Sequence, residues 1–135
     1  HAALGLSQLQ RSDEMLERRR KIAERYAEAF EQLSSIKGHS GIVEGHAYHL
    51  YLIEVEQRKG LFDHLRSKGI LVQVHYIPFH LMPYYQERGW RKGDLPNAER
   101  YYSRCLSLPI FPSLEEDERG SVIEEIWGFY GAPRS

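Results

Sequence analysis

Apolar residues recur at helical spacing along the first quarter of the chain. The stripe repeats every seven residues and has the members Leu9, Leu16, Ala23 and Phe30, with Tyr26 and Leu33 between them. This period predicts one long amphipathic helix over residues 2–36, ended by Gly38 and Gly41. A coiled coil is the competing interpretation, but Asp13 and Arg19 stand where further apolar residues would be needed. Packing of this helix across a sheet is therefore favoured.

The remaining chain alternates between strand-like and helix-like patterns. Expected strands cover 46–56, 70–76 and 106–110; expected helices cover 61–69, 94–105 and a last segment from 113 onward. The proline-rich stretch 77–93 is expected to be a loop with at most one helical turn. This order predicts a single α/β domain over residues 1–135, in which a small sheet of about three strands is covered by helices.

The last helix has a start signal and an apolar face. Ser113 and Glu116 have the spacing of a capping box, and acidic residues follow in the first turn, where the helix dipole favours them. Its expected buried face consists of Val122, Ile123, Ile126, Trp127 and Tyr130.

Charge and composition exclude several classes of protein. With 18 basic and 19 acidic residues the net charge is -1, so neither a nucleic acid nor an anionic membrane is an expected partner. No apolar run approaches the roughly 20 residues that span a bilayer. The single cysteine, Cys105, allows no intramolecular disulfide and favours a cytoplasmic location. The chain opens at His1 without an initiator methionine and directly in a helical pattern, for which a processed tag or a truncation is the favoured interpretation.

One segment concentrates side chains that can bind a ligand. Between Val74 and Tyr85 lie His75, Tyr76, His80 and Tyr84, at the end of an expected strand and in a proline-stiffened loop. Imidazole and phenol groups hydrogen-bond hydroxyls and phosphates, and their rings stack on sugars and bases. Spacing alone leaves two interpretations open: a ligand-binding loop, or a loop whose tyrosines cover the edge of the core.

Other candidate chemistry is weaker. A metal site at His75 and His80 is disfavoured, because Pro78 prevents a helical arrangement and no carboxylate or cysteine is near in sequence. In the second small cluster, His46, Tyr48 and His49, a structural role is favoured. Cys105 is expected to be a buried, inert thiol. The sequence contains no glycine-rich phosphate loop, Ser-His-Asp order or paired-carboxylate motif.

Ordered motifs along the chain resemble those of the DegT/StrS-type sugar aminotransferases. The opening Ala2–Leu9 segment, with Asp13 and Arg18 to Arg20, resembles the helix that begins the small domain of that family. The matching segments continue with Tyr48-His49-Leu50-Tyr51, then Arg66 to Tyr85, then Asn97 to Leu114. The Val72–Pro78 form is most similar to the branch that aminates a UDP-linked 4-keto-6-deoxy-hexosamine towards pseudaminic acid.

The resemblance implies the C-terminal small domain of a fold-type-I enzyme dependent on pyridoxal phosphate, with a mostly antiparallel sheet. The complete homodimeric enzyme would transfer an amino group from glutamate to a nucleotide-linked 4-keto-6-deoxy sugar. Carried over by position, the resemblance makes His75, Tyr76, His80 and Tyr84 the expected substrate-binding residues. It assigns no catalytic, cofactor-binding or metal-binding residue to this chain.

The resemblance also limits what this chain does by itself. The lysines at 21, 37, 59, 68 and 92 match no Schiff-base motif of the family, so we expect pyridoxal phosphate to be bound mainly by a large domain and the isolated chain to be inactive. A non-catalytic regulatory or binding module of the same fold is the alternative.

Overall fold

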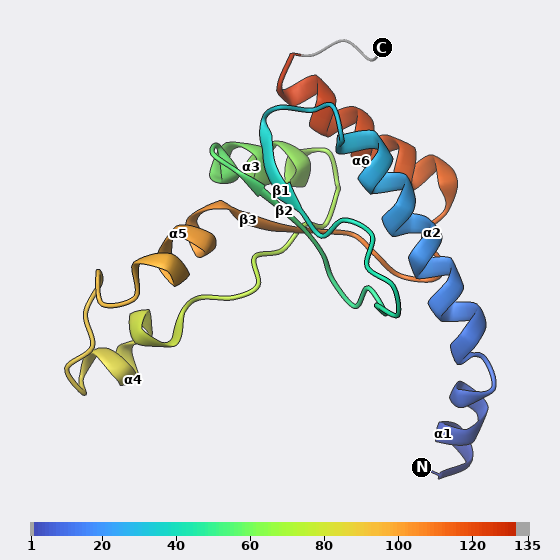
Figure 1. Ribbon diagram of the computed structural model, residues 1–135, viewed down its shortest axis with the longest axis horizontal. Coiled ribbons are helices and arrows are strands. Elements are labelled where there is room, and N and C mark those ends of the chain that lie inside the picture. Colours follow the sequence, from blue (N-terminus) through green and yellow to red (C-terminus); the bar gives the residue numbers. More distant parts are fainter. Residues whose placement is uncertain (1, 132–135) are drawn as a thin grey trace.

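The computed structural model of the protein describes residues 2–131. Helices surround a three-stranded antiparallel sheet, which confirms the α/β class expected from the sequence (Figure 1). In chain order the elements are α1 (Ala2–Leu9), α2 (Ser12–Phe30), β1 (Ile36–His39), β2 (Tyr51–Val55), α3 (Arg58–Ser67), the 3-10 helix η1 (Phe79–Leu81), α4 (Pro83–Gln86), α5 (Pro96–Arg104), β3 (Cys105–Leu108) and α6 (Glu116–Phe129).

The sheet has the order β1-β2-β3, with β2 in the centre. On β2 the side chains of Tyr51, Ile53 and Val55 are buried, and the two residues between them are half-buried, as the period of two requires. Tyr51 lies opposite Leu108 of β3, and Ile53 lies opposite Leu106. This register stacks apolar side chains on one face of the sheet.

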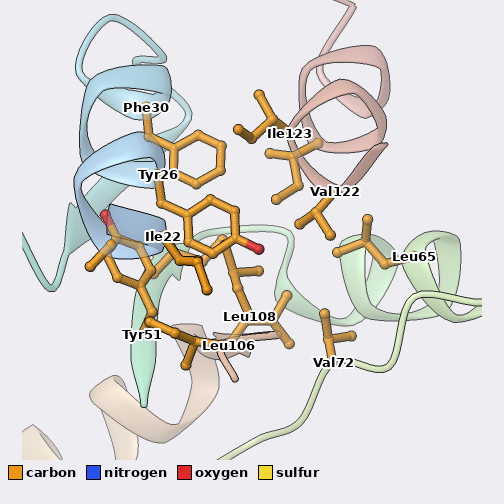
Figure 2. Packing of buried hydrophobic residues seen from close by; sticks show 14 of the residues in the cluster. Ile22, Tyr26, Phe30, Tyr51, Leu65, Val72, Leu106, Leu108, Val122 and Ile123 are labelled. Carbon is orange, nitrogen blue, oxygen red and sulfur yellow. The ribbon is translucent and has the colours of Figure 1, made fainter. Parts of the chain in front are cut away.

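The hydrophobic core lies where α2 and α6 pack against that sheet. Figure 2 shows Tyr26 and Phe30 of α2 pointing towards Val122 and Ile123 of α6. The Tyr26 hydroxyl in this core donates to the Pro109 carbonyl oxygen at 3.0 Å. A further bond joins the two helices directly, because Trp127 Nε1 donates to the Ala29 carbonyl oxygen at 3.1 Å.

The long helix expected over 2–36 is two helices, and it ends earlier. Its ladder breaks at Arg11, and the Ser12 hydroxyl donates to the Leu9 carbonyl oxygen at 2.7 Å, as serine does when it competes with helix hydrogen bonds. Ala23, Tyr26, Phe30 and Leu33 are buried as expected, but Leu9 is 67% exposed. The apolar stripe of α1 thus contacts no core among the described residues (Leu4, Leu6 and Leu9 are all exposed).

Two strand assignments change. Residues 36–39, expected at a helix end, form β1, whose register shifts between Ile36 and Gly38. The strand expected over 70–76 was wrong: it forms only an isolated bridge, Gln73 to Ser107. Of its apolar residues Val72 is buried but Leu71 is exposed, so the segment follows the β3 edge for one bridge and then leaves it.

The other expected elements are of the predicted kind, helix or strand, but they begin and end at different residues. The strand expected over 46–56 covers 51–55, and the helix with Pro96 in its first turn is α5. The capping box of α6 lies two residues later than expected. Glu118 Oε2 accepts from the backbone N–H of Glu115 at 3.0 Å, because Glu115 is the residue with extended backbone before the first turn. Val122, Ile123 and Ile126 are buried, and Trp127 and Tyr130 are partly buried.

Residues 77–95, here called the arm, carry η1 and α4 and connect to α5. Figure 1 shows the arm projecting from the sheet to the side opposite α2 and α6. Most of its side chains are exposed.

Candidate functional site

The candidate segment leaves the body of the protein at His75. Gln73 exchanges two backbone hydrogen bonds with Ser107 of β3, at 2.8 and 3.2 Å. Two residues later His75 Nδ1 lies 2.7 Å from the Ser107 hydroxyl oxygen. Ser107 is one of two buried polar side chains among the described residues, so its hydroxyl fixes the half-buried imidazole at the sheet edge.

Tyr76 is oriented away from the body. Its side chain is 69% exposed, and its ring stands edge-on to that of His75 with 4.6 Å between centroids. The peptide bond between the two residues is cis. His75 and Tyr76, both expected to bind substrate, are thus adjacent, one held by the sheet and one open to solvent.

His80 has a different environment from the other candidates. It is 2% exposed, and its Nε2 lies 2.8 Å from Glu99 Oε1 at the start of α5. The same carboxylate oxygen accepts from the backbone N–H of Gly93 at 2.6 Å. The hydrogen bond from His80, followed by that from Gly93, lowers the pKa of the Glu99 carboxyl, because both stabilise its ionised form.

Tyr84 lies on α4 and is 58% exposed. The guanidinium carbon of Arg88 lies 3.5 Å from the centre of its ring, and Arg88 also donates to the Tyr84 carbonyl oxygen at 2.9 Å. The arrangement is a cation–π contact that holds a positive charge beside an exposed phenol. Such a pair can bind an anionic, hydroxyl-rich ligand.

Three residues near the site were not found from the sequence. Phe79, 71% exposed, adds a further exposed aromatic ring, whose centroid lies 5.9 Å from that of Tyr85. Glu99 and Ser107 lie outside the candidate segment and hold its two histidines. A signal existed for Ser107, the one polar residue in the apolar run of 105–108, whereas nothing local marks Glu99 among the acidic residues of helix starts.

The second small cluster is structural. Residues 46–50 form a loop rather than the start of a strand, and Tyr48 is buried with a positive φ of 47°. Its hydroxyl oxygen accepts from the Val43 backbone N–H at 2.7 Å, and its backbone N–H donates to His46 Nδ1 at 3.0 Å. Hollows of about 430 and 520 Å³ flank this loop, but the polar groups that line them at Tyr48 are already paired.

Cys105 is buried and unoxidised at the start of β3. Burial raises the pKa of its thiol, and the Arg58 charge acts in the other direction. A buried thiol of raised pKa is a poor nucleophile, as the sequence indicated.

All five lysines of this chain are exposed, whereas a lysine that forms a Schiff base needs a desolvated pocket or neighbouring cations. Three of them pair with carboxylates: Lys21 with Glu17, Lys59 with Asp63, and Lys68 with Glu125. Within residues 2–131 no group of three or more acidic, histidine or cysteine side chains is placed to hold a metal. Over the same residues no helix is both long and apolar enough to cross a membrane.

The antiparallel sheet and its helical cover match the fold of fold-type-I aminotransferases. The chain belongs to the DegT/DnrJ/EryC1/StrS aminotransferase family, whose model matches residues 1–127. It is 42% identical over 134 residues to the spore coat polysaccharide biosynthesis protein SpsC of Bacillus subtilis, across 93% of this chain and 34% of SpsC.

Two solved structures show the same fold. Spr1654 of Streptococcus pneumoniae, described as a sugar aminotransferase, superposes with a TM-score of 0.88 at 30% identity, over 96% of this chain and 34% of that one. PseC of Helicobacter pylori, an aminotransferase involved in the biosynthesis of pseudoaminic acid, gives 0.86 at 26% identity, over 96% and 36%. Spr1654 is known in PLP and PMP forms, which supports pyridoxal phosphate as the cofactor of the family. The chain spans about a third of the length of these relatives.

Proposed function

We propose that this chain is the C-terminal small domain of an enzyme that transfers an amino group from glutamate to a nucleotide-linked 4-keto-6-deoxy sugar. The observation that carries the proposal is the family match over residues 1–127, together with the superposition on Spr1654. The proposal includes a large domain that holds pyridoxal phosphate, a homodimeric enzyme and a cytoplasmic location. The isolated chain is then inactive, which agrees with the exposure of all five of its lysines.

In this proposal the exposed aromatic groups near His75 and on the arm face the nucleotide sugar. Tyr76 and Tyr84 have free ring surface, and the Arg88 charge beside Tyr84 suits a phosphate. His75 is held by Ser107 with its other nitrogen, Nε2, available as a hydrogen-bonding group. His80 belongs to the same site through its bond to Glu99 rather than through an exposed imidazole.

The proposal commits to the class of keto sugar and leaves the pseudaminic branch as one member of that class. Identity to PseC is 26%, against 42% to SpsC, so sequence similarity favours no assignment to the pseudaminic branch.

The test uses the full-length protein that contains this chain. We expect the purified protein to show the visible absorbance of bound pyridoxal phosphate, to lose it on addition of glutamate, and to recover it on addition of a UDP-linked 4-keto-6-deoxy sugar. The 135-residue chain alone should show neither absorbance nor amination. A full-length protein without cofactor absorbance would contradict the proposal and favour a regulatory module.

A further inference from the structure

The arm is held to the body without an apolar core of its own. Among the described residues 77–95, His80 is the only buried side chain. The aromatic rings of Phe79 and Tyr84 are exposed, so they contribute no burial that would fix the arm. His80 is therefore the one fully buried anchor that this segment offers.

The contacts of His80 are polar and converge on one carboxylate. Glu99 Oε1 accepts from His80 Nε2 at 2.8 Å and from the Gly93 backbone N–H at 2.6 Å. His80 is in η1, at the near end of the arm, and Gly93 is in the loop that returns to α5. The Glu99 side chain in the first turn of α5 thus binds both the segment that enters the arm and the segment that returns from it.

Burial makes this arrangement costly to break. The Glu99 side chain is 16% exposed and His80 is 2% exposed, so loss of either partner leaves a shielded polar group unpaired. The other ring nitrogen, Nδ1 of His80, has no hydrogen-bond partner among the described residues. An imidazole that carries its proton on Nε2 donates from that atom to Glu99 and leaves Nδ1 as an acceptor. A glutamine side chain at position 80 also offers an N–H donor together with an acceptor oxygen.

The remaining bonds of the arm are local. Arg91 donates to the Gln86 carbonyl oxygen at 2.8 Å and to that of Trp90 at 2.9 Å, and the Arg91 backbone donates to Asp94 at 2.7 Å. These bonds shape the tip of the arm without joining it to α5. The Trp90 ring packs edge-on near His80, with 6.5 Å between centroids.

We propose that His80 and Glu99 are positioning residues that fasten the arm to α5 and so orient the exposed rings of Phe79 and Tyr84 towards the nucleotide sugar. Neither residue touches the substrate. The identity of the ligand rests on the proposed function; the fastening of the arm itself rests on the contacts above.

The first measurement is the hydrogen exchange of residues 77–95 in the full-length protein. We expect His80→Leu and Glu99→Ala to raise exchange of this segment by roughly tenfold, since each removes a hydrogen bond involving a charged group. His80→Gln keeps an N–H donor and should stay close to wild type. Ser103→Ala, an exposed position of α5 with a local bond to Arg100, is the matched control, and residues 116–129 are the internal reference for global unfolding.

The second measurement follows the two half-reactions separately, the reaction with glutamate and the reaction with the keto sugar. We expect His80→Leu and Glu99→Ala to raise KM for the keto sugar by about tenfold, with the reaction of glutamate unchanged and with rescue in His80→Gln. If His80→Leu does not fold, Glu99→Ala supplies the same two measurements.

Exchange that is unchanged in both loss variants would overturn the proposal, as would equal effects of leucine and glutamine at position 80. Faster exchange with an unchanged KM for the sugar would overturn the positioning role. A wild-type protein without cofactor absorbance, but with faster exchange of residues 77–95 in both His80→Leu and Glu99→Ala, would refute the proposed function and support the positioning role of His80 and Glu99.

Discussion

Nδ1 of His75 lies 2.7 Å from the hydroxyl oxygen of Ser107, 32 positions further along the chain. Ser107 also exchanges both backbone hydrogen bonds with Gln73, so one residue of β3 aligns the segment by main chain and by side chain. The segment therefore begins with a single β-bridge at the edge of the sheet. The His75 imidazole, two residues after Gln73, is positioned by this bridge and by its own contact with Ser107.

This relationship predicts a small, specific cost for removing the hydroxyl. Ser107→Ala in the 135-residue chain should lower the free energy of unfolding by about 1 kcal/mol, because a part-buried hydrogen bond is lost and Nδ1 of His75 is left unpaired. Denaturant unfolding measures it. Ser103→Ala, which removes only an exposed bond to Arg100, should change stability by less than about 0.5 kcal/mol. Equal losses in both variants would show that the Ser107 contact contributes nothing of its own.

The buried phenols predict loss of stability at alkaline pH. Burial raises the pKa of Tyr26 and of Tyr51 well above the ordinary 10.0. Because the folded state keeps protons that the unfolded state releases, their contribution is complete below pH 10.0 and is lost as pH rises towards the folded values. The free energy of unfolding should fall between about pH 9 and pH 11, and it should fall less steeply in the Tyr26→Phe variant than in wild type. A flat profile in both proteins would contradict the prediction.

Glu99 predicts the opposite dependence at acid pH. Its pKa is lowered by the hydrogen bond from His80 and then by that from Gly93, so its contribution is present above the unfolded-state pKa. That contribution is lost as pH falls through the lowered folded value. Acid titration of stability should be shallower in Glu99→Gln than in wild type, whereas Glu87→Gln, exposed on the arm, should match wild type. Identical profiles for all three proteins would exclude a stabilising role.

Apolar residues of α1 and α6 should respond differently to truncation. Ile126 of α6 is fully buried, so Ile126→Ala should cost about 2–5 kcal/mol of stability. Leu9 of α1 is 67% exposed, and Leu9→Ala should stay within about 0.5 kcal/mol in this chain. Thermal or denaturant unfolding compares the two directly. A large cost at Leu9 would mean that α1 packs where the structure shows it exposed.

The exposed phenols should affect sugar binding and not folding. In the full-length protein, Tyr76→Ala and Tyr84→Ala should raise KM for the keto sugar about tenfold, because each removes a ring that can stack on the ligand. The reaction with glutamate should be unchanged. Tyr130→Phe, at the end of α6, is the control that leaves KM for the sugar unaltered. An unchanged KM in both alanine variants would remove these residues from the site.

The parts of the fold that the sequence predicted are those set by local periodicity. Ala23, Tyr26 and Phe30 recur at helical spacing, and a face that repeats every turn is buried wherever the helix packs. β1 was missed because its four residues, with Gly38 at their centre, contain no alternating run; it exists through its pairing with β2. The expected strand at 70–76 had apolar, β-branched residues but only one bridge to β3.

The same distinction applies to the site. Composition located the segment from His75 to Tyr85, but it treated His75 and His80 alike, as groups for a ligand. Their difference comes from partners far away in the chain: Ser107 for one and Glu99, 19 residues on, for the other. Contacts of this kind depend on how α5 and β3 are placed in space, which no local pattern encodes.

The narrow attachment of the arm has a practical consequence for engineering. Since residues 77–95 share so little buried surface with the body and are held through His80 and Glu99, the arm resembles a removable cassette. Exchanging it between family members that keep this histidine and this glutamate should leave the hydrophobic core intact. Chimeras of that design would transplant the exposed rings of Phe79 and Tyr84 without redesigning the domain that carries them.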